Sequence, residues 1–448
     1  MKKIKSRSLF TLIPVVILAI GLCIFIIRLI IHGGMWVSSA TLTNVRSGGV
    51  LIVGTVVDRN GVILADTHEG RRVFAEQGEL RRALLHVVGD AAGNIGTGVM
   101  TVYATDLIGY NFFSGIYSVS GSGNLVTLTI DSRLNLAAYR ALDGRRGAVM
   151  VMNFESGEIL AMVSNPTFDP AAPPVILDGD PAFEGVFLNR AISSAFTPGS
   201  VFKLLTAAIA YENTEQLIER VFYCYGSLQV GAGMVTCLRA HGRMYIEQAM
   251  AVSCNVVFGT LAVEVGADTM ARYVQQMGLS DSINVGRVRT IRGNFEKADA
   301  NSAELAWSGV GQFTNTVNPA AMLRFVAAIA NGGIAVEMSL TERTGFSSLT
   351  SLSSSRIMST DTADFLYWIM DYNQHSPERL SSFPGLQIHA KTGTAEVGND
   401  MRPHAWFTGF ITNPDFPLAF VVIVEHGGGG FAVAAPIANQ VLQAAISG

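Results

Sequence analysis

Charge is scarce in this 448-residue chain, where 15% of the residues are charged against about 25% in an average soluble protein. The 31 basic and 35 acidic residues nearly cancel, so the chain offers no concentrated basic surface and a nucleic-acid binder is excluded. Four cysteines are too few for a disulfide-built scaffold. The low charge content excludes disorder as the main state, and the length of 448 residues predicts two or three domains with buried cores.

Lysine is the scarcer of the two cationic residues. Only 6 of the 31 basic residues are lysines, and three of these lie within the first five positions. The remaining three are Lys203, Lys297 and Lys391. Arginine does not deprotonate in proteins, whereas a desolvated lysine can act as a base. Lys203 and Lys391 are therefore candidates for chemistry, and we interpret Lys297 as a surface residue.

Long apolar runs are also few, and the one that occurs covers residues 9–31 with Arg28 near its far end. A helix of this length crosses a hydrocarbon layer about 30 Å thick. The basic residues before it predict a cytoplasmic tail over residues 1–8 and a single-pass cell-membrane protein whose C-terminal domain lies outside the cytoplasm. A cleaved signal peptide with a small-residue site at 38–40 is the alternative, but the length of the run favours an uncleaved anchor.

Two patterns follow the apolar run. Short strand signals, an Asn60-Gly61 turn and glycine-rich stretches predict a small β-rich pedestal domain over residues 32–145, which carries no chemical motif. From 146 to 448, strands at both ends enclose helices, which predicts one α/β domain with an antiparallel sheet flanked by helices. The expected strands cover residues 148–153, 158–164, 386–394, 405–411 and 418–425, and the expected helices cover 200–211, 245–266, 319–330 and a segment from 436.

The first chemical motif is Ser200-Val201-Phe202-Lys203, at the start of an expected helix. Side chains three residues apart share a helical face, so Lys203 can lie beside Ser200. A serine is a weak nucleophile until a neighbouring base takes its proton, and a lysine kept neutral by burial can be that base. Alone the motif is weak, because Ser-x-x-Lys arises by chance in a chain this long and most lysines are solvated.

The second motif is Ser253-Cys254-Asn255. A hydroxyl and an amide two residues apart can enter one cleft, where the hydroxyl relays protons and the amide orients a peptide bond. Helix capping is the ordinary role of such residues.

The third motif is Lys391-Thr392-Gly393-Thr394, on an expected strand. One cation and two hydroxyls suit a bound carboxylate, and Gly393 allows an extended ligand to lie close to a strand edge. The ordinary interpretation is a strand end with a glycine between two β-branched residues.

The ordered set of motifs resembles the signature of penicillin-binding proteins and class A β-lactamases. With its apolar N-terminal run, the chain is similar over nearly its whole length to the class B, monofunctional penicillin-binding proteins, which are peptidoglycan D,D-transpeptidases. Two features depart from the family: Cys254 stands where many relatives carry serine or another small residue, and the pedestal is short. Segments similar to those of the family cover residues 57–65, 189–191, 309–312, 331–333, 404–409 and 435–438.

The resemblance implies the penicillin-binding serine-acyltransferase fold, no cofactor, no metal, and a role for each motif residue. Ser200 would be the acylated nucleophile and Lys203 its general base. Ser253 would pass a proton to the leaving amine, and Asn255 would bind the donor peptide. The residues implied to bind the terminal carboxylate are Lys391, which would also assist the proton relay, Thr392 and Thr394. Gly393 is the further substrate-binding residue, beside which the extended ligand would lie. Backbone N–H groups of Ser200 and Thr394 would form the oxyanion hole.

The implied substrate is a stem peptide ending in D-Ala-D-Ala, whose acyl group passes to an amine on a neighbouring stem, and β-lactams would acylate the same serine. The implied partner is a polytopic membrane glycosyltransferase of the shape, elongation, division and sporulation family, because this length leaves no room for a glycan-polymerising module. The alternatives are a D,D-carboxypeptidase, a membrane-anchored β-lactamase, a β-lactam receptor and a catalytically inactive scaffold of a wall-synthesis complex. No deacylation glutamate is identified for a β-lactamase, and eight residues before the apolar run leave no signalling module for a receptor.

Three of the four cysteines lie outside the apolar run that contains Cys23. Cys224 and Cys237 flank a hairpin-like stretch, with His241 four residues beyond. A disulfide is the leading hypothesis for a chain outside the cytoplasm, with free thiols and a metal site as alternatives. Two cysteines and one histidine do not complete a zinc site.

Overall fold

The computed structural model describes residues 13–26, 46–47, 50–51, 54–69, 71–108, 123–177, 179–342, 353–374, 381–398 and 401–447. The chain forms two compact units. The first consists of Met1–Val56, Ala65–Phe74 and Tyr103–Val126, and the second consists of Val57–Leu64, Ala75–Val102 and Thr127–Gly448.

The first unit contains most of a four-stranded sheet with the strand order β5-β4-β3-β6. The hairpin expected around Asn60-Gly61 is confirmed, since β3 and β4 are neighbours in this sheet and Gly61 has a φ of 81°. The strands are β3 (Thr55–Val57), β4 (Ile63–His68), β5 (Arg71–Phe74) and β6 (Leu125–Thr127). The other short elements of this unit are β1 (Arg46–Ser47), β2 (Val50–Leu51) and α5 (Ala104–Ile108).

The expected membrane anchor at 9–31 is described over residues 13–26, which are helical with exposed side chains. Residues 9–12 and 27–31 lie outside the described residues, as do the tail at 1–8 and the alternative cleavage site at 38–40. Within the described part of the chain, no helix is both long enough and apolar enough to cross a membrane.

A five-stranded antiparallel sheet organises the second unit, with the strand order β17-β18-β19-β7-β8. All five expected strands are confirmed to within a few residues, and β18 and β19 are almost continuously buried because both faces of the sheet are covered. The strands are β7 (Gly147–Asn153), β8 (Ile159–Asn165), β17 (Ile388–Ala395), β18 (His404–Asn413) and β19 (Phe416–Val424).

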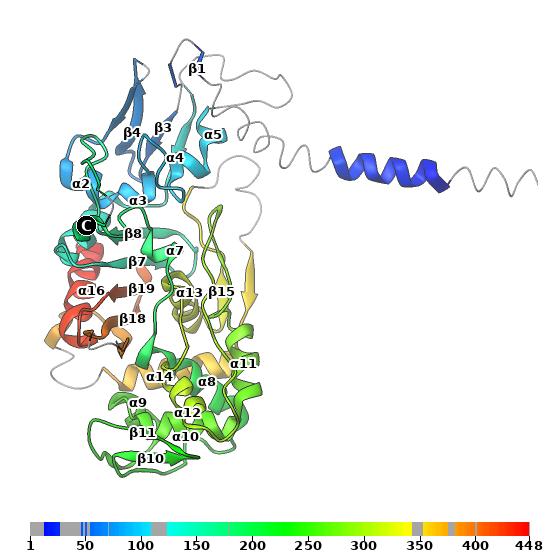
Figure 1. The fold of residues 1–448 in the computed structure, drawn as a ribbon, viewed down its shortest axis with the longest axis vertical. Coiled ribbons are helices and arrows are strands. Elements are labelled where there is room, and N and C mark those ends of the chain that lie inside the picture. The colour runs from blue at the N-terminus through cyan, green and yellow to red at the C-terminus, as the bar shows by residue number, and fades with distance from the viewer. Residues whose placement is uncertain are drawn as a thin grey trace, which may run out of the picture. The chain divides into compact units, whose positions relative to one another are not determined.

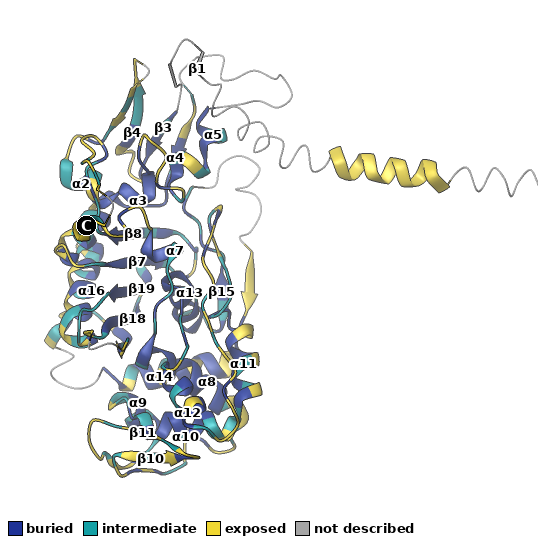
Figure 2. Cartoon of the chain, in the orientation of Figure 1, coloured by how far each residue is buried: buried dark blue, intermediate teal, exposed yellow. Residues whose placement is uncertain are grey.

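Helices cover both faces of this sheet (Figure 1). Helices α6 (Ser132–Leu142) and α16 (Gly430–Ile446) share one apolar core with one face of the sheet, and α13 (Pro319–Ala330) packs on the other. The bounds expected for α13 are confirmed, and Asn318 caps it by accepting hydrogen bonds from Ala320 and Ala321. Figure 2 shows the strands of this sheet and α13 as largely buried.

The second unit contains further helices. Those that bear on the site or the nearby packing are α7 (Arg190–Ser193), η2 (Gly199–Phe202), α8 (Lys203–Asn213), α9 (Ile246–Ala251), α10 (Asn255–Val265), α11 (Ala267–Gln276), α12 (Ala303–Val310) and α14 (Thr360–Tyr372). The unit also contains helices α2 (Gly78–Ala83), α3 (Leu85–Val88) and α4 (Val99–Val102), the turn η1 (Pro181–Phe183) and strands β13 (Asn284–Val285), β14 (Val288–Arg289), β15 (Ile334–Val336) and β16 (Ser354–Arg356).

The single helix expected over residues 245–266 is wrong. The chain forms α9, then a turn, and then α10, because Ser253 adopts a left-handed φ of 54° and Cys254 is extended. Such a φ is costly for a residue with a side chain, so the turn is held by its surroundings. Before this turn, two small ladders pair β9 (Phe222–Cys224) with β12 (Gly242–Met244) and β10 (Ser227–Val230) with β11 (Gly233–Thr236).

Candidate active site

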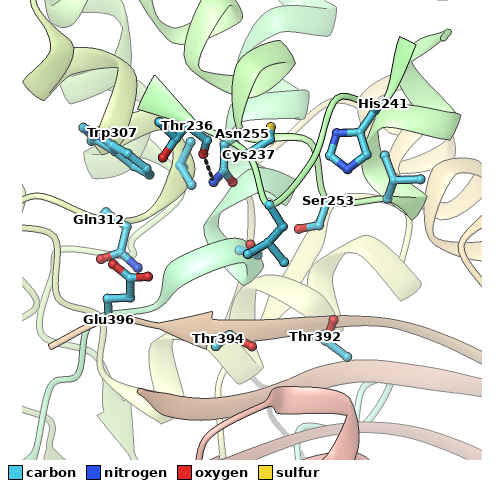
Figure 3. Close-up of a pocket in the computed structure, with 14 residues that line it drawn as sticks. Thr236, Cys237, His241, Ser253, Asn255, Trp307, Gln312, Thr392, Thr394 and Glu396 are labelled. Atoms are coloured by element: carbon cyan, nitrogen blue, oxygen red, sulfur yellow. Dashed lines mark hydrogen bonds between the residues drawn. The ribbon is translucent and has the colours of Figure 1, made fainter. Parts of the chain in front are cut away.

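Three segments that are far apart in the sequence meet around a cavity of about 370 Å³. The turn η2 contributes Ser200, the turn between α9 and α10 contributes Ser253 and Asn255, and β17 contributes Thr392 and Thr394. Figure 3 shows the two threonines on their strand, with Ser253 and Asn255 across the cavity. The fold therefore brings all three sequence motifs into one site.

The backbone around Ser200 is fixed by glycine packing. Gly199 has a left-handed φ of 55°, and its N–H donates to the Gly311 carbonyl at 2.9 Å. Two residues before Gly199, the Thr197 carbonyl accepts a hydrogen bond from the Trp406 indole at 2.9 Å. Two hydrogen bonds from different elements thus hold the segment that presents the serine hydroxyl.

Lys203 is completely buried and its amine is the centre of the site. The Nζ atom lies 3.1 Å from Ser200 Oγ, 3.1 Å from Ser253 Oγ and 2.7 Å from Asn255 Oδ1, and it also contacts the Ser253 carbonyl at 2.6 Å. Burial lowers the pKa of Lys203 to about 7, against the opposing effect of the nearby Cys254 and Cys237 thiols. A neutral amine next to Ser200 is therefore accessible near neutral pH, as a general base requires.

Lys391 is also buried and does not line the cavity. Its Nζ lies 3.1 Å from Ser253 Oγ and 3.2 Å from the Thr392 carbonyl. The Ser253 hydroxyl is thus shared by two lysine amines, a geometry that suits proton transfer and the relay expected of Lys391. A bound carboxylate in the cavity would meet the hydroxyls of Thr392 and Thr394 first.

Asn255 connects the turn to the neighbouring hairpin. Its Nδ2 donates to the Thr236 carbonyl at 2.8 Å while its Oδ1 accepts from Lys203, so the amide orientation is determined at both ends. The first of these bonds is drawn in Figure 3. Asn255 and Ser253 both line the cavity, as the sequence motif predicts for a substrate-facing pair.

The third motif lies at the edge of the sheet, since β17 pairs with β18 and is the outermost strand in the order. Thr392 and Thr394 line the cavity, and the Gly430 N–H donates to Thr394 Oγ1 at 3.3 Å. Gly393 is not part of the cavity lining. An added Cβ there would lie 2.8 Å from the Pro198 carbonyl, so this glycine lets β17 pack against the nucleophile segment.

Several residues of the cavity had no signal in the sequence motifs. Trp307, Gln312 and Glu396 are among them, and Figure 3 shows Gln312 close to Glu396. With its amide turned to satisfy both groups, Gln312 donates to the Glu396 carbonyl at 3.2 Å and accepts from the Glu396 N–H at 3.1 Å. The segment at 309–312 carried a family resemblance, which is the only feature that pointed to Gln312.

The disulfide expected between Cys224 and Cys237 is wrong, because both residues are free thiols. The expectation overlooked Cys254, which the turn after α9 brings to the same place. Its Sγ lies 3.7 Å from the Cys237 Sγ, and the Cys224 Sγ lies 3.5 Å from the His241 Nδ1. Among the described residues, this cluster of three cysteines and one histidine is the one group arranged to hold a metal ion.

Comparison with known families identifies residues 147–443 as a penicillin binding protein transpeptidase domain. The chain belongs to the penicillin-binding protein transpeptidase family. It is 30% identical over 382 residues to the peptidoglycan D,D-transpeptidase PbpA of Mycobacterium tuberculosis, with 75% of each chain covered. It is 27% identical to stage V sporulation protein D of Bacillus subtilis, over 73% of this chain and 54% of that protein.

Solved structures of the family show the same fold. The ceftriaxone acyl-enzyme complex of penicillin-binding protein A from M. tuberculosis superposes with a TM-score of 0.77 at 25% identity, covering 88% of this chain and 98% of that one. The D,D-transpeptidase domain of a peptidoglycan glycosyltransferase from Eggerthella lenta has a TM-score of 0.74 at 27% identity, with the same coverage. The expected α/β transpeptidase fold with an antiparallel sheet is thereby confirmed.

Proposed function

We propose that this chain is a serine D,D-transpeptidase that cross-links peptidoglycan stem peptides through an acyl-enzyme on Ser200. One observation carries the assignment of roles: the buried amine of Lys203 lies 3.1 Å from the hydroxyls of both Ser200 and Ser253. A single base in contact with a nucleophile and with a second hydroxyl can take one proton and direct it onward. Acyl transfer through a serine needs such an adjacent base, because the hydroxyl is a weak nucleophile without it.

In the first half-reaction, Ser200 Oγ attacks the carbonyl carbon of the penultimate D-Ala and its proton passes to the neutral Lys203 amine. The tetrahedral intermediate carries its charge on the former carbonyl oxygen, which the Ser200 and Thr394 N–H groups would stabilise. The C–N bond then breaks, and the leaving amine of D-Ala receives a proton from the Ser253 hydroxyl. Ser253 is supplied in turn by Lys203 and Lys391, which both contact it.

The substrate peptide would lie along the outer edge of β17, where an extended chain can pair with backbone groups. Its terminal carboxylate would accept hydrogen bonds from Thr392 and Thr394, with the charge of buried Lys391 behind them. Asn255 would hold the donor peptide from the opposite wall. This arrangement accounts for the polar cavity lining on both sides of Ser200.

In the second half-reaction, an amine of a neighbouring stem attacks the ester carbon of the acyl-enzyme. Its proton leaves through Lys203, and the Ser200 oxygen recovers a proton as the ester breaks. Attack by water instead would make the protein a D,D-carboxypeptidase, and rapid attack by water on a penicilloyl ester would make it a β-lactamase. The reaction path therefore depends on which nucleophile enters the cavity.

The cellular placement that we propose for this domain is derived from the sequence expectations. A membrane anchor at residues 9–31, a pedestal at 32–145 and a transpeptidase domain at 146–448 outside the cytoplasm would set the active site in the wall layer. A polytopic membrane glycosyltransferase would supply the glycan strands. The apolar run supports the anchor, and the relatives named as transpeptidases support the wall location.

The test is intact-mass analysis of the full chain after incubation with labelled penicillin. We expect one stable adduct per chain that is lost in Ser200→Ala and retained in Ser354→Ala, where the exposed serine of β16 serves as the matched control. Drug hydrolysis without a lasting adduct would indicate a β-lactamase, and neither adduct nor hydrolysis would indicate an inactive scaffold. Incubation with a stem pentapeptide and an added amine then distinguishes a transpeptidase, which forms a cross-linked product, from a carboxypeptidase, which only releases D-Ala.

A further inference from the structure

We propose that Cys224, Cys237, His241 and Cys254 bind one Zn²⁺ ion, and that this ion positions the Ser253–Asn255 turn of the active site. The four residues are spread over 31 positions of the sequence and lie in three different segments. Cys224 ends β9, Cys237 and His241 lie between β11 and β12, and Cys254 caps α10.

The distances fit a tetrahedral ion. With Zn–S bonds of about 2.3 Å and a Zn–N bond of about 2.0–2.1 Å, two ligand sulfurs lie about 3.8 Å apart and a sulfur and a nitrogen about 3.5 Å apart. The Cys237 and Cys254 sulfurs are 3.7 Å apart, and the Cys224 sulfur is 3.5 Å from His241 Nδ1. All four ligand atoms lie within 4.8 Å of one another, so the remaining edges can close around one ion.

The ligand chemistry selects the ion. Three thiolates and one imidazole are soft and borderline donors, which favour Zn²⁺ over Mg²⁺ or Ca²⁺. The Val256 N–H points at Cys237 Sγ from 3.4 Å, a hydrogen bond that suits a thiolate. Cys224 and Cys254 are buried, whereas Cys237 and His241 line the active-site cavity and leave a path for the ion to enter.

The surrounding hairpin has only a small apolar core of its own. Its local apolar cluster consists of Val230, Val235 and Ala306 with a few partly buried neighbours. Tyr225 is 81% exposed and Leu238 is fully exposed, so these large side chains add little buried area. A tetrahedral ion would join both ladders of this region to the start of α10, as structural zinc sites do in small domains.

Cys254 couples the proposed ion to catalysis because it lies between Ser253 and Asn255 in the chain. The Ser253 backbone is left-handed, and both neighbours of Cys254 contact the Lys203 amine. A ligand bond to Cys254 would hold this costly turn in the conformation that places both side chains against Lys203. Cys254 is thus a positioning residue for the reaction.

Metal content of the purified full chain tests the site itself. We expect one zinc per chain, which is lost in Cys224→Ser, Cys254→Ser and His241→Ala and retained in two controls. Cys23→Ser removes the one cysteine outside the cluster, and His68→Ala removes an exposed histidine. Zinc that remains in all three cluster variants would place the ion elsewhere and overturn the proposal.

The unmodified chain provides a second measurement, which holds even where a variant does not fold. X-ray absorption should show three sulfurs at about 2.3 Å and one nitrogen at about 2.0–2.1 Å from zinc, and Co²⁺ exchanged into the chain should show the spectrum of a tetrahedral thiolate complex. A metal-free chain with free thiols, or with a Cys237–Cys254 disulfide, would overturn the proposal.

Removal of the metal tests the positioning role. We expect chelation to slow acylation by penicillin about 10- to 100-fold, because small misplacements of catalytic groups have effects of this size, and Zn²⁺ to restore it. In Ser253→Ala, chelation should cause much less further loss, because the ion acts through that turn. An equal loss in both proteins, or no loss in either, would contradict positioning while the metal content still reports on the site. The zinc assignment stands or falls independently of the transpeptidase assignment.

Discussion

The Gly199 amide donates to the Gly311 carbonyl at 2.9 Å, and the two glycines lie in direct backbone contact. An added Cβ on Gly311 would lie 2.1 Å from the Gly199 carbonyl oxygen, and its φ is 86°. Ser200 follows Gly199 immediately, so the position of the nucleophile depends on the absence of a side chain on a helix cap more than 100 residues away.

Gly311→Ala should therefore displace the nucleophile segment and lower penicillin acylation by more than about tenfold, consistent with the sensitivity of reacting groups to small shifts. Gly332→Ala is the matched control, since Gly332 also has a left-handed φ of 56° but has open space around its Cβ position. The control should lose about 1–2 kcal/mol of stability from its backbone conformation and keep its acylation rate. Equal acylation rates in the two variants would contradict the argument.

The pH dependence of acylation should follow Lys203. Its pKa of about 7 in the folded protein is depressed by burial, and the base form is the neutral amine. The rate of penicillin acylation should therefore rise as the pH increases through about 7 and level off above it. Stopped-flow measurements with a labelled penicillin check this, and a rate that falls with rising pH across the same region would exclude Lys203 as the base.

Lys203→Arg should abolish this rise, because a guanidinium stays protonated and cannot accept the proton of Ser200. We expect acylation to slow by about 10² to 10⁴, the usual contribution of a general base. Lys297→Arg is the control, since its side chain is more than half exposed and lies outside the cavity. A variant Lys203→Arg that acylates at the normal rate would rule out the proposed proton acceptor.

Ser253 and Lys391 should behave as one unit in kinetics. The Lys391 amine reaches the site through its 3.1 Å contact with the Ser253 hydroxyl. Ser253→Ala should slow acylation by about 10² or more. Adding Lys391→Ala to this variant should slow acylation much less than Lys391→Ala slows it in the unsubstituted protein, because the effects of residues that act together are not additive. A double-mutant cycle on acylation rates measures this, and strict additivity would mean that Lys391 acts directly on the substrate.

Arg190 should be a determinant of stability. Its side chain is 5% exposed, its Nε lies 2.5 Å from Glu425 Oε1, and it also donates to the Gly185 carbonyl at 2.8 Å. Arg190→Ala leaves a mostly buried carboxylate unpaired and should cost about 3–5 kcal/mol. Arg220→Ala breaks the half-exposed pair with Glu264 and should cost about 0–1 kcal/mol, so thermal unfolding of the two variants compares them directly.

Much of the fold could be predicted because its signals are local. Asn318 followed by Pro319 marks the start of α13, and the continuous apolar run of β19 marks a strand covered on both faces. The helix expected at 245–266 was wrong for the opposite reason. Apolar residues continue on both sides of Ser253, and the left-handed turn there depends on tertiary contacts that no local propensity records.

The sequence by itself determined the sheet strands, the helix that starts at Pro319 and the three motifs with their order, because hydrophobic period, capping and residue chemistry are properties of short segments. The tertiary structure alone decided which groups meet. It turned Lys391 toward Ser253, packed Gly393 against the nucleophile segment, and brought Cys254 to Cys224, Cys237 and His241. These contacts join residues up to 195 positions apart, and their distances depend on how the elements pack rather than on any one element.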